Sequence, residues 1–144
     1  MQLNAYLMYD GNCREAFDFY ERALGARNAG VTTYGDMPDA DPGMPAAQRD
    51  RVIHVRLEGP GGWVLMGSDM PPGMPYQGIE GVSMSLQVGS AAEGDRVYAA
   101  LLEGGGEVTM PMGETFWAER FGMLKDRFGL NWMVNFDGAK AKAA

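Results

Sequence analysis

Hydrophobic positions along the chain alternate between strand-like and helix-like spacing. Residues 3–10 (LNAYLMYD) carry apolar side chains at alternate positions, which predicts a β-strand. The next segment predicts a helix, with Asn12 as its N-cap and Gly25 as its stop. Its apolar stripe consists of Ala16, Phe17, Tyr20, Ala23 and Leu24. Residues 28–36 (NAGVTTYGD) are β-branched and predict a second strand.

The second half of the chain repeats this order. A shift of 78 residues takes Tyr20 to Tyr98, and a shift of 69 takes Trp63 to Trp132. The difference is the extra length of the first copy, which we assign to the Pro-, Gly- and Asp-rich loop of residues 37–50. Two copies with one element order indicate an internal repeat.

The repeat predicts an α+β fold built from tandem β-α-β-β-β units. We expect one domain, residues 1–144, made of repeats at about 1–70 and 79–137 with a Pro/Met-rich linker between them. Residues 138–144 have the composition of a polar tail. Each unit leaves one sheet face uncovered by its helix, so the two sheets are expected to form a partly open mixed sheet or barrel with a central cleft.

Charge limits the classes of partner. The chain has 12 Lys and Arg against 19 Asp and Glu, a formal charge of −7. This balance argues against nucleic acid and anionic membrane as partners, since both need a concentrated positive field. The first ten residues do not have the pattern of a signal peptide, and no run approaches the roughly 20 apolar residues of a membrane helix. We therefore expect a cytoplasmic protein.

A single cysteine, Cys13, excludes an intrachain disulfide, and no Cys/His spacing of a zinc site is present. Cys13 is expected at the start of a helix without a chemical role. The alternative is a reactive thiol, because helix N-termini lower thiol pKa values.

Four stretches resemble a known family. They are LNAYLMYDGNCREAFDFY with the FDFYERALG helix, VIHVRL, VLMGSD and ETFWAERFGMLKDRFGLNWMVN. They are similar to the vicinal oxygen chelate superfamily of glyoxalases, bleomycin-resistance proteins and extradiol dioxygenases, whose fold is the tandem β-α-β-β-β unit. The closer likeness is to the PhnB-like branch, often labelled 3-demethylubiquinone 3-methyltransferases. No glycine-rich loop of a nucleotide-binding crossover supports that label. The resemblance also implies a homodimer.

The resemblance implies positions for a divalent metal. In metal-dependent members four strands each supply a His, Glu or Gln, and these positions fall near Ala5, Val64, Ser83 and Met133. None is a suitable ligand, and neighbouring positions add no His, Glu or Asp. We therefore expect no cofactor at the usual metal site, which argues against glyoxalase I activity, extradiol cleavage and metal-dependent fosfomycin opening.

Several polar residues are candidates for catalysis or for anchoring a ligand. Alternation in VIHVRL places His54, the only histidine, on the same strand face as Arg56. Asp36 and Glu114 are expected at equivalent places in the two copies, and Asp69 at a strand end. One His with carboxylates could perform acid–base chemistry or hold a displaced metal. The alternative is that His54 only joins two strands, and that Asp36 and Glu114 are solvated acids.

Aromatic residues of the last hairpin divide between core and site. Alternation in LNWMVN puts Trp132 in the core, whereas Trp117 follows Phe116 at a junction beside Glu114 and Arg120. Such an aromatic wall suits a planar or amphipathic ligand, although simple packing remains the alternative.

The sequence therefore predicts a PhnB-like protein that binds a small organic molecule in a cleft without the usual metal. Trp117 and Phe116 would supply stacking area, while Arg56, Arg120 and Asp69 would be polar contacts. Two alternatives remain: a lyase or isomerase using a displaced metal or a His/carboxylate pair, and a structural dimer without a ligand.

Overall fold

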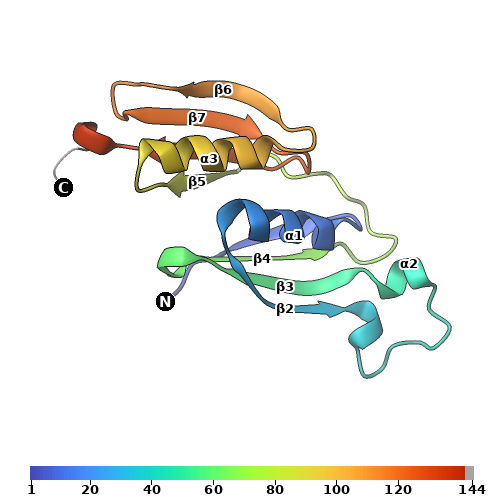
Figure 1. Cartoon of the computed structure of the whole chain (residues 1–144). Helices are drawn as coiled ribbons and strands as arrows, with labels where there is room; N and C mark the ends of the chain where they lie inside the picture. Colours follow the sequence, from blue (N-terminus) through green and yellow to red (C-terminus); the bar gives the residue numbers. More distant parts are fainter. Residues whose placement is uncertain (142–144) are drawn as a thin grey trace. The chain divides into compact units, whose positions relative to one another are not determined.

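A strand, a helix and three further strands follow one another twice along the chain (Figure 1). The computed structural model describes residues 1–141 and divides into two units, Met1–Gly78 and Ile79–Ala144. The first unit contains β1 (Ala5–Tyr9), α1 (Cys13–Leu24), β2 (Arg27–Thr33), η1 (Tyr34–Asp36), α2 (Ala46–Arg49), β3 (Val52–Glu58), η2 (Pro60–Gly62) and β4 (Val64–Asp69). The second contains β5 (Ser83–Gln87), α3 (Ala91–Leu102), β6 (Glu107–Gly113), β7 (Arg120–Lys125), β8 (Asn131–Phe136) and η3 (Gly138–Lys140).

Each unit has one open four-stranded mixed sheet. The strand orders are β1-β4-β3-β2 and β5-β8-β7-β6, with β1 parallel to β4, β5 parallel to β8, and the other pairs antiparallel. The helix between the first two strands of each unit packs on its own sheet, as Figure 1 shows for α1 and α3. The α+β fold with tandem units is confirmed, while the cleft expected between the repeats stays a prediction.

Helix α1 ends as predicted but begins differently. Gly25 adopts the left-handed conformation at the C-cap, with φ of 63°, and its N–H bonds to the carbonyl of Glu21. Asn12 occupies the N-cap position, yet its side chain makes no capping hydrogen bond. Instead, the carboxylate of Asp69 at the end of β4 accepts from the backbone N–H of Cys13 at 3.0 Å. The cap therefore comes from a residue far along the chain.

The repeat register of 69 residues is wrong for the last two strands. Gly59 N–H bonds to the carbonyl of Trp63 across the β3–β4 turn, and Asp126 N–H bonds to that of Leu130 across the β7–β8 turn. Equivalent closing pairs are thus 67 residues apart. The position equivalent to Trp132 is then Leu65 rather than Trp63. The two tryptophans are the same residue type but occupy different positions in their repeats.

The strand register also shows that Asp36 and Glu114 are not equivalent residues of the two repeats. Arg27 opposite Glu58 corresponds to Glu107 opposite Lys125, a shift of 80 between β2 and β6. Asp36 lies in η1 after β2, whereas Glu114 directly follows β6, so the two acids do not hold equivalent places as expected. The loop of residues 37–50 also contains one short helix, α2.

Each sheet has one face covered by its own helix, and we call the opposite side the helix-free face. In unit 1 a Cβ on Gly67 would meet the ring of Phe17 on α1, so Gly67 faces the helix. Because strand residues alternate between the two faces, Val64, Met66 and Ser68 of β4 belong to the helix-free face. In unit 2 a Cβ on Gly122 would meet Tyr98 of α3, which places the adjacent Phe121 on the helix-free face. Candidate site residues can therefore be assigned to faces.

Candidate functional site

The predicted site residues fall into two groups, one in each unit. Asp36, His54, Arg56 and Asp69 belong to unit 1. Glu114, Phe116, Trp117 and Arg120 belong to unit 2. Each group has its own geometry.

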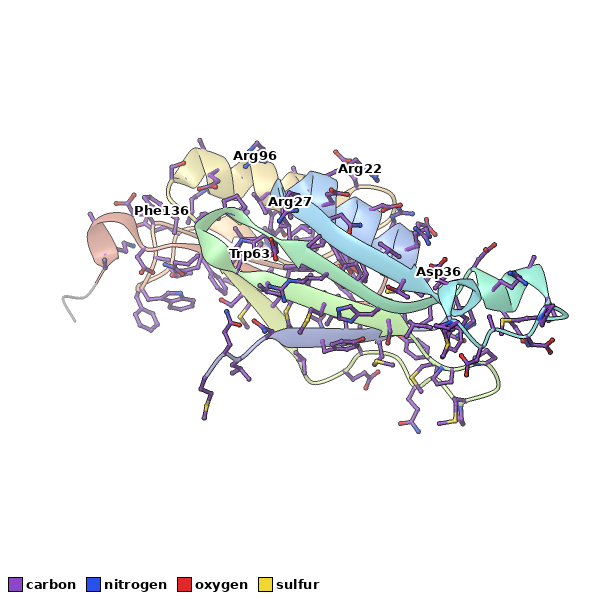
Figure 2. All side chains as sticks on the ribbon, turned by 90° about the horizontal axis from the view of Figure 1, so that it is seen from below. Arg22, Arg27, Asp36, Trp63, Arg96 and Phe136 are labelled. Atoms are coloured by element: carbon purple, nitrogen blue, oxygen red, sulfur yellow. The ribbon has the colours of Figure 1, made fainter. Side chains whose placement is uncertain are left out.

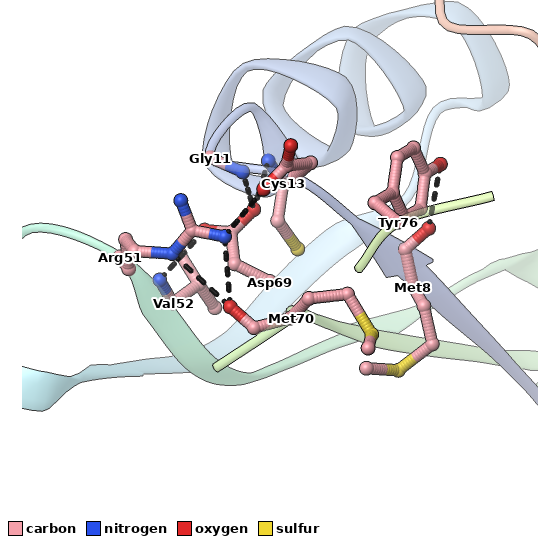
Figure 3. A network of polar contacts seen from close by, with 9 residues as sticks. Met8, Gly11, Cys13, Arg51, Val52, Asp69, Met70 and Tyr76 are labelled. Carbon is pink, nitrogen blue, oxygen red and sulfur yellow. Dashed lines mark hydrogen bonds and ion pairs between the residues drawn. The ribbon is translucent and has the colours of Figure 1, made fainter. Parts of the chain in front are cut away.

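Asp69 anchors backbone groups of the β1–α1 loop, helix α1 and strand β3 (Figure 3). It is 2% exposed, and its Oδ1 accepts from the N–H groups of Gly11 and Cys13 at 2.8 and 3.0 Å. Its Oδ2 accepts from the N–H of Val52 at 2.8 Å, which ties β3 to the same carboxylate. Arg51 beside it donates to the carbonyl of Met70 at 2.8 Å. Both Asp69 oxygens hold backbone donors, an arrangement that favours a structural role.

Asp36 makes an equally local contact. Its Oδ2 accepts from the backbone N–H and the hydroxyl of Thr33, both at 2.9 Å, closing a capping box around η1. These hydrogen bonds lower the pKa of the Asp36 carboxyl. Figure 2 places Asp36 at the end of the unit 1 sheet away from Trp63.

His54 contacts a residue that the sequence analysis did not single out. The hydroxyl of Tyr6 on β1 lies 3.2 Å from His54 Nδ1 and 3.4 Å from the carbonyl of Ile53. The two rings are stacked, with centroids 5.7 Å apart and planes at 29°. Since β4 lies between β1 and β3, Tyr6 reaches across one strand, and only the strand order could have predicted this pair.

Arg56 shares the His54 face of β3 by alternation, as predicted. Its Nε donates to Glu58 Oε1 at 2.9 Å, and Glu58 also pairs with Arg27. The Arg56 hydrogen bond is the main cause that lowers the pKa of the Glu58 carboxyl. Arg56 therefore belongs to a surface ion-pair network close to His54.

The aromatic residues of unit 2 form a contiguous cluster. Phe116 and Trp117 meet edge to face with centroids 4.8 Å apart, and Trp117 meets Phe121 in the same manner at 5.1 Å. Phe116 is 84% exposed and Trp117 38%, whereas Phe121 is buried. We call these three residues the aromatic cluster.

A short turn fixes the aromatic cluster. Thr115 N–H bonds to the carbonyl of Ala118, and Ala118 N–H bonds to the hydroxyl of Thr115, both at 3.0 Å. The segment near the C-terminus holds this turn, since Lys140 Nζ bonds to the carbonyl of Thr115 and pairs with the carboxylate of Glu114. That contact lowers the pKa of Glu114. The two exposed rings are thus mounted on a preorganised turn.

Arg120 points away from the aromatic cluster. Its Nε and Nη2 donate to Asp95 on α3 at 3.0 and 2.6 Å, so its side chain lies on the helix side of β7. Phe121, the next residue, lies on the helix-free face with Trp117. The structure therefore does not bring Arg120 together with Trp117.

Beside the aromatic cluster lies a polar group that sequence reasoning missed. Asn135 on β8 is the cross-strand partner of Phe121, and its Nδ2 donates to Gln87 Oε1 at 2.9 Å and Asp137 Oδ1 at 2.6 Å. By the alternation of β8, Asn135 lies on the other face of the sheet from Trp132. The hydrogen-bond partners depended on strand pairing and gave no sequence signal.

The residues present do not fit the family's divalent metal. Ala5 shares the alternation of Leu7 and Tyr9, so it lies on the helix-covered face of β1. On the helix-free face β4 offers Val64, Met66 and Ser68, which are poor donors for a hard cation. Within residues 1–141, no three His, Cys, Asp or Glu side chains are grouped so as to hold a metal ion. Likewise, no helix in this range is long and apolar enough to cross a membrane.

The tandem β-α-β-β-β fold and the matching sequence define a class of protein. Residues 2–134 match the Glyoxalase/Bleomycin resistance protein/Dioxygenase superfamily, and the chain belongs to this family. Protein YjdN of Escherichia coli (strain K12) is 34% identical over 143 residues, covering 94% of this chain and 95% of YjdN.

Solved structures agree with this assignment. The crystal structure of protein PA1353 from Pseudomonas aeruginosa is 47% identical, with a TM-score of 0.84 and coverage of 95% of this chain and 98% of PA1353. A PhnB protein from Bacillus cereus, described as a putative 3-demethylubiquinone-9 3-methyltransferase, has a TM-score of 0.75 at 22% identity, covering 94% and 99% of the two chains. This second likeness concerns the fold alone.

Proposed function

We propose that the chain binds a small organic molecule with a planar apolar part against the aromatic cluster of unit 2. The observation that carries the proposal is the exposure of Phe116 and Trp117 on a turn held by hydrogen bonds. Exposed aromatic rings that are already ordered lose little conformational entropy when a ligand covers them. Such rings gain apolar burial at small cost, which favours recognition.

Binding in this proposal does not use the family's divalent metal. The support is the donor set on the helix-free sides of β4 and β8, where thioether, hydroxyl and amide groups stand in place of the imidazoles and carboxylates of metal-dependent family members. Elemental mass spectrometry after soaking with Zn²⁺, Mn²⁺, Fe²⁺ and Ni²⁺ tests this part. We expect no retained metal, and about one equivalent per chain would contradict it.

The ligand site is tested by two-dimensional ¹H–¹⁵N NMR with a fragment set of planar aromatic acids, amines and neutral compounds. The indole N–H signals of Trp117 and Trp132 report on an exposed and a buried place in unit 2. We expect bound fragments to shift the Trp117 signal and to leave the Trp132 signal unchanged, and Trp117→Ala to abolish binding. A set of fragments that never shifts the Trp117 signal would overturn the proposal.

A second candidate function rests on the contact between Tyr6 and His54. A phenol 3.2 Å from an imidazole nitrogen can share or pass a proton, which suits a lyase or isomerase that removes a proton next to a carbonyl. The test is exchange of such C–H protons with D₂O, followed by NMR on simple 2-oxo acids. Exchange should fall in both His54→Ala and Tyr6→Phe, and exchange that persists in His54→Ala would exclude this role.

The predicted homodimer supplies the third candidate, a structural role for the aromatic cluster. Light scattering of wild-type and Phe116→Ala protein separates it from ligand binding. Under the proposed function the variant keeps the oligomeric state of the wild type, whereas dissociation caused by Phe116→Ala would assign the cluster to a subunit interface.

A further inference from the structure

Asn135 carries a buried hydrogen-bond acceptor that has no donor among residues 1–141. The side chain is 9% exposed, and its Oδ1 is buried without a partner. Buried polar atoms in folded proteins are satisfied almost without exception, so an orphaned carbonyl oxygen calls for a donor. A ligand is one source of such a donor.

Chemistry fixes which end of the amide is unpartnered. Asn135 Nδ2 lies 2.6 Å from Asp137 Oδ1 and 2.9 Å from Gln87 Oε1. An ionised carboxylate only accepts hydrogen bonds, so the NH₂ end must face Asp137. The opposite orientation would set two acceptor oxygens against each other. The free group is therefore the carbonyl oxygen, and its missing partner is an N–H or O–H.

The surroundings add negative charge and aromatic surface. Asp137 follows Asn135 by two residues and is bonded to its amide, and no Lys or Arg among the described residues forms an ion pair with Asp137. Phe121 is the cross-strand partner of Asn135, and its ring packs edge to face against the ring of Trp117. Acceptors and π faces thus lie together, and the cation on the adjoining turn, Lys140, is paired with Glu114 rather than with Asp137.

We propose that this place binds the ammonium group of an organic amine. The N–H donors of the amine would satisfy Asn135 Oδ1 and Asp137, while its hydrocarbon or aryl part covers Trp117 and Phe116. Ammonium groups only donate hydrogen bonds and are attracted to aromatic faces, so both properties match the site. The chain's charge of −7 also favours the approach of cations over anions. Asn135 Oδ1 is covered in the unliganded chain. A neighbouring side chain therefore has to rotate before the ammonium group can reach this oxygen.

This inference rests on the proposed function and narrows it to one class of ligand. A carboxylate ligand would meet Asp137 with like charge, and a neutral ligand would leave Asp137 without a counterion. The property to measure is therefore the difference in affinity between cationic, neutral and anionic ligands of similar shape.

Three probes of similar shape test it: 2-phenylethylamine, 2-phenylethanol and 3-phenylpropionate. They are titrated against the full chain by fluorescence in a Trp63→Phe background, which removes one tryptophan distant in sequence from the site. We expect the amine to bind at least about fivefold more tightly than the alcohol, and the acid to bind most weakly.

Asp137→Asn removes the charge but keeps an oxygen that can accept from Asn135 Nδ2. It should reduce the preference for amine over alcohol to less than about twofold. Glu103→Gln, an exposed acid after α3, is the matched control and should leave the preference unchanged.

The outcomes separate the two proposals. Equal binding of amine and alcohol to the wild type would overturn the inference while the proposed function stands. A preference that survives Asp137→Asn would overturn it as well. If none of the three probes nor any fragment perturbs Trp117, both proposals fail.

Discussion

Asp69 at the end of β4 and Cys13 at the start of α1 are 56 residues apart in the sequence and joined by a hydrogen bond of 3.0 Å. The same carboxylate holds Gly11 and Val52, so one side chain fixes the start of the helix and two strands (Figure 3). A buried carboxylate with three backbone donors is a strong structural anchor. Through it the β1–α1 loop, α1 and β3 are all tied to the end of β4.

Asp69→Asn should destabilise the chain by about 3 kcal/mol, because an amide NH₂ would face a buried backbone N–H and leave it unsatisfied. Urea unfolding followed by circular dichroism measures the change. Asp10→Asn is the control: Asp10 pairs with Arg51 at the surface and its loss should cost less than about 1 kcal/mol. Equal effects of the two substitutions would contradict the anchoring role.

Cys13 should not react with thiol reagents in the folded chain. The side chain is fully buried, and burial, with the Asp69 charge as a second cause, raises the pKa of its thiol far above the ordinary value. A thiolate is therefore not formed at pH 8, despite the position at a helix N-terminus. We expect Ellman's reagent to label Cys13 only after unfolding in urea, and rapid labelling of the native chain would contradict this account.

Local patterns predicted much of the fold, while contacts between distant residues were missed. Gly25 was predicted as the helix stop because only a residue tolerant of positive φ ends a helix in this way. Asn12 was predicted as the cap, but the donor groups at this helix end bond to Asp69, which no local pattern could reveal. Cross-strand partners depend on strand order in the same way.

The candidate site shows the same limit. Exposed Trp117 and buried Trp132 were separated by alternation and by the junction before β7. The orphaned oxygen of Asn135 was not foreseen, since it depends on Gln87 and Asp137 taking the amide end. Matching the repeats by identical residues also made Trp63 the equivalent of Trp132. The hydrogen bonds across the β3–β4 and β7–β8 turns show that Leu65 is the equivalent residue.

Lys140→Gln should raise the pKa of Glu114 towards its ordinary value. In the wild type the hydrogen bond from Lys140 lowers this pKa, and the attraction of the Lys140 charge adds to it. Because the pKa of Glu114 is lower in the folded state than in the unfolded state, ionised Glu114 stabilises the fold at pH values above its unfolded-state pKa. This stabilisation is lost as the pH falls through the folded-state pKa. Carboxyl ¹³C NMR titration measures the shift.

Asp36 serves as the internal control in that titration. Its pKa is lowered by hydrogen bonds from Thr33 and should be the same in wild type and Lys140→Gln. A Glu114 pKa that does not respond to the substitution would show that Lys140 does not hold the turn carrying Phe116 and Trp117.

Two tryptophans in the same unit should lose very different amounts of stability when each is replaced by phenylalanine. Trp132 is 2% exposed, and its Nε1 donates to Asp126 Oδ2 at 2.8 Å, so Trp132→Phe loses a hydrogen bond to a buried carboxylate and leaves a void. We expect a loss of about 2–3 kcal/mol in the free energy of unfolding, measured in urea. Trp117→Phe keeps an aromatic ring at an exposed position and should change stability by less than about 1 kcal/mol.

Ligand binding should follow the reverse order. The smaller ring in Trp117→Phe reduces the surface that a planar ligand can cover, whereas Trp132 faces α3 and does not reach the aromatic cluster. Fragment affinity measured by ligand-detected NMR should therefore fall in Trp117→Phe and persist in Trp132→Phe at temperatures where that variant is folded. If Trp117→Phe destabilised the chain as much as Trp132→Phe, Trp117 would be a core residue, because an exposed ring available to a ligand contributes little to folding.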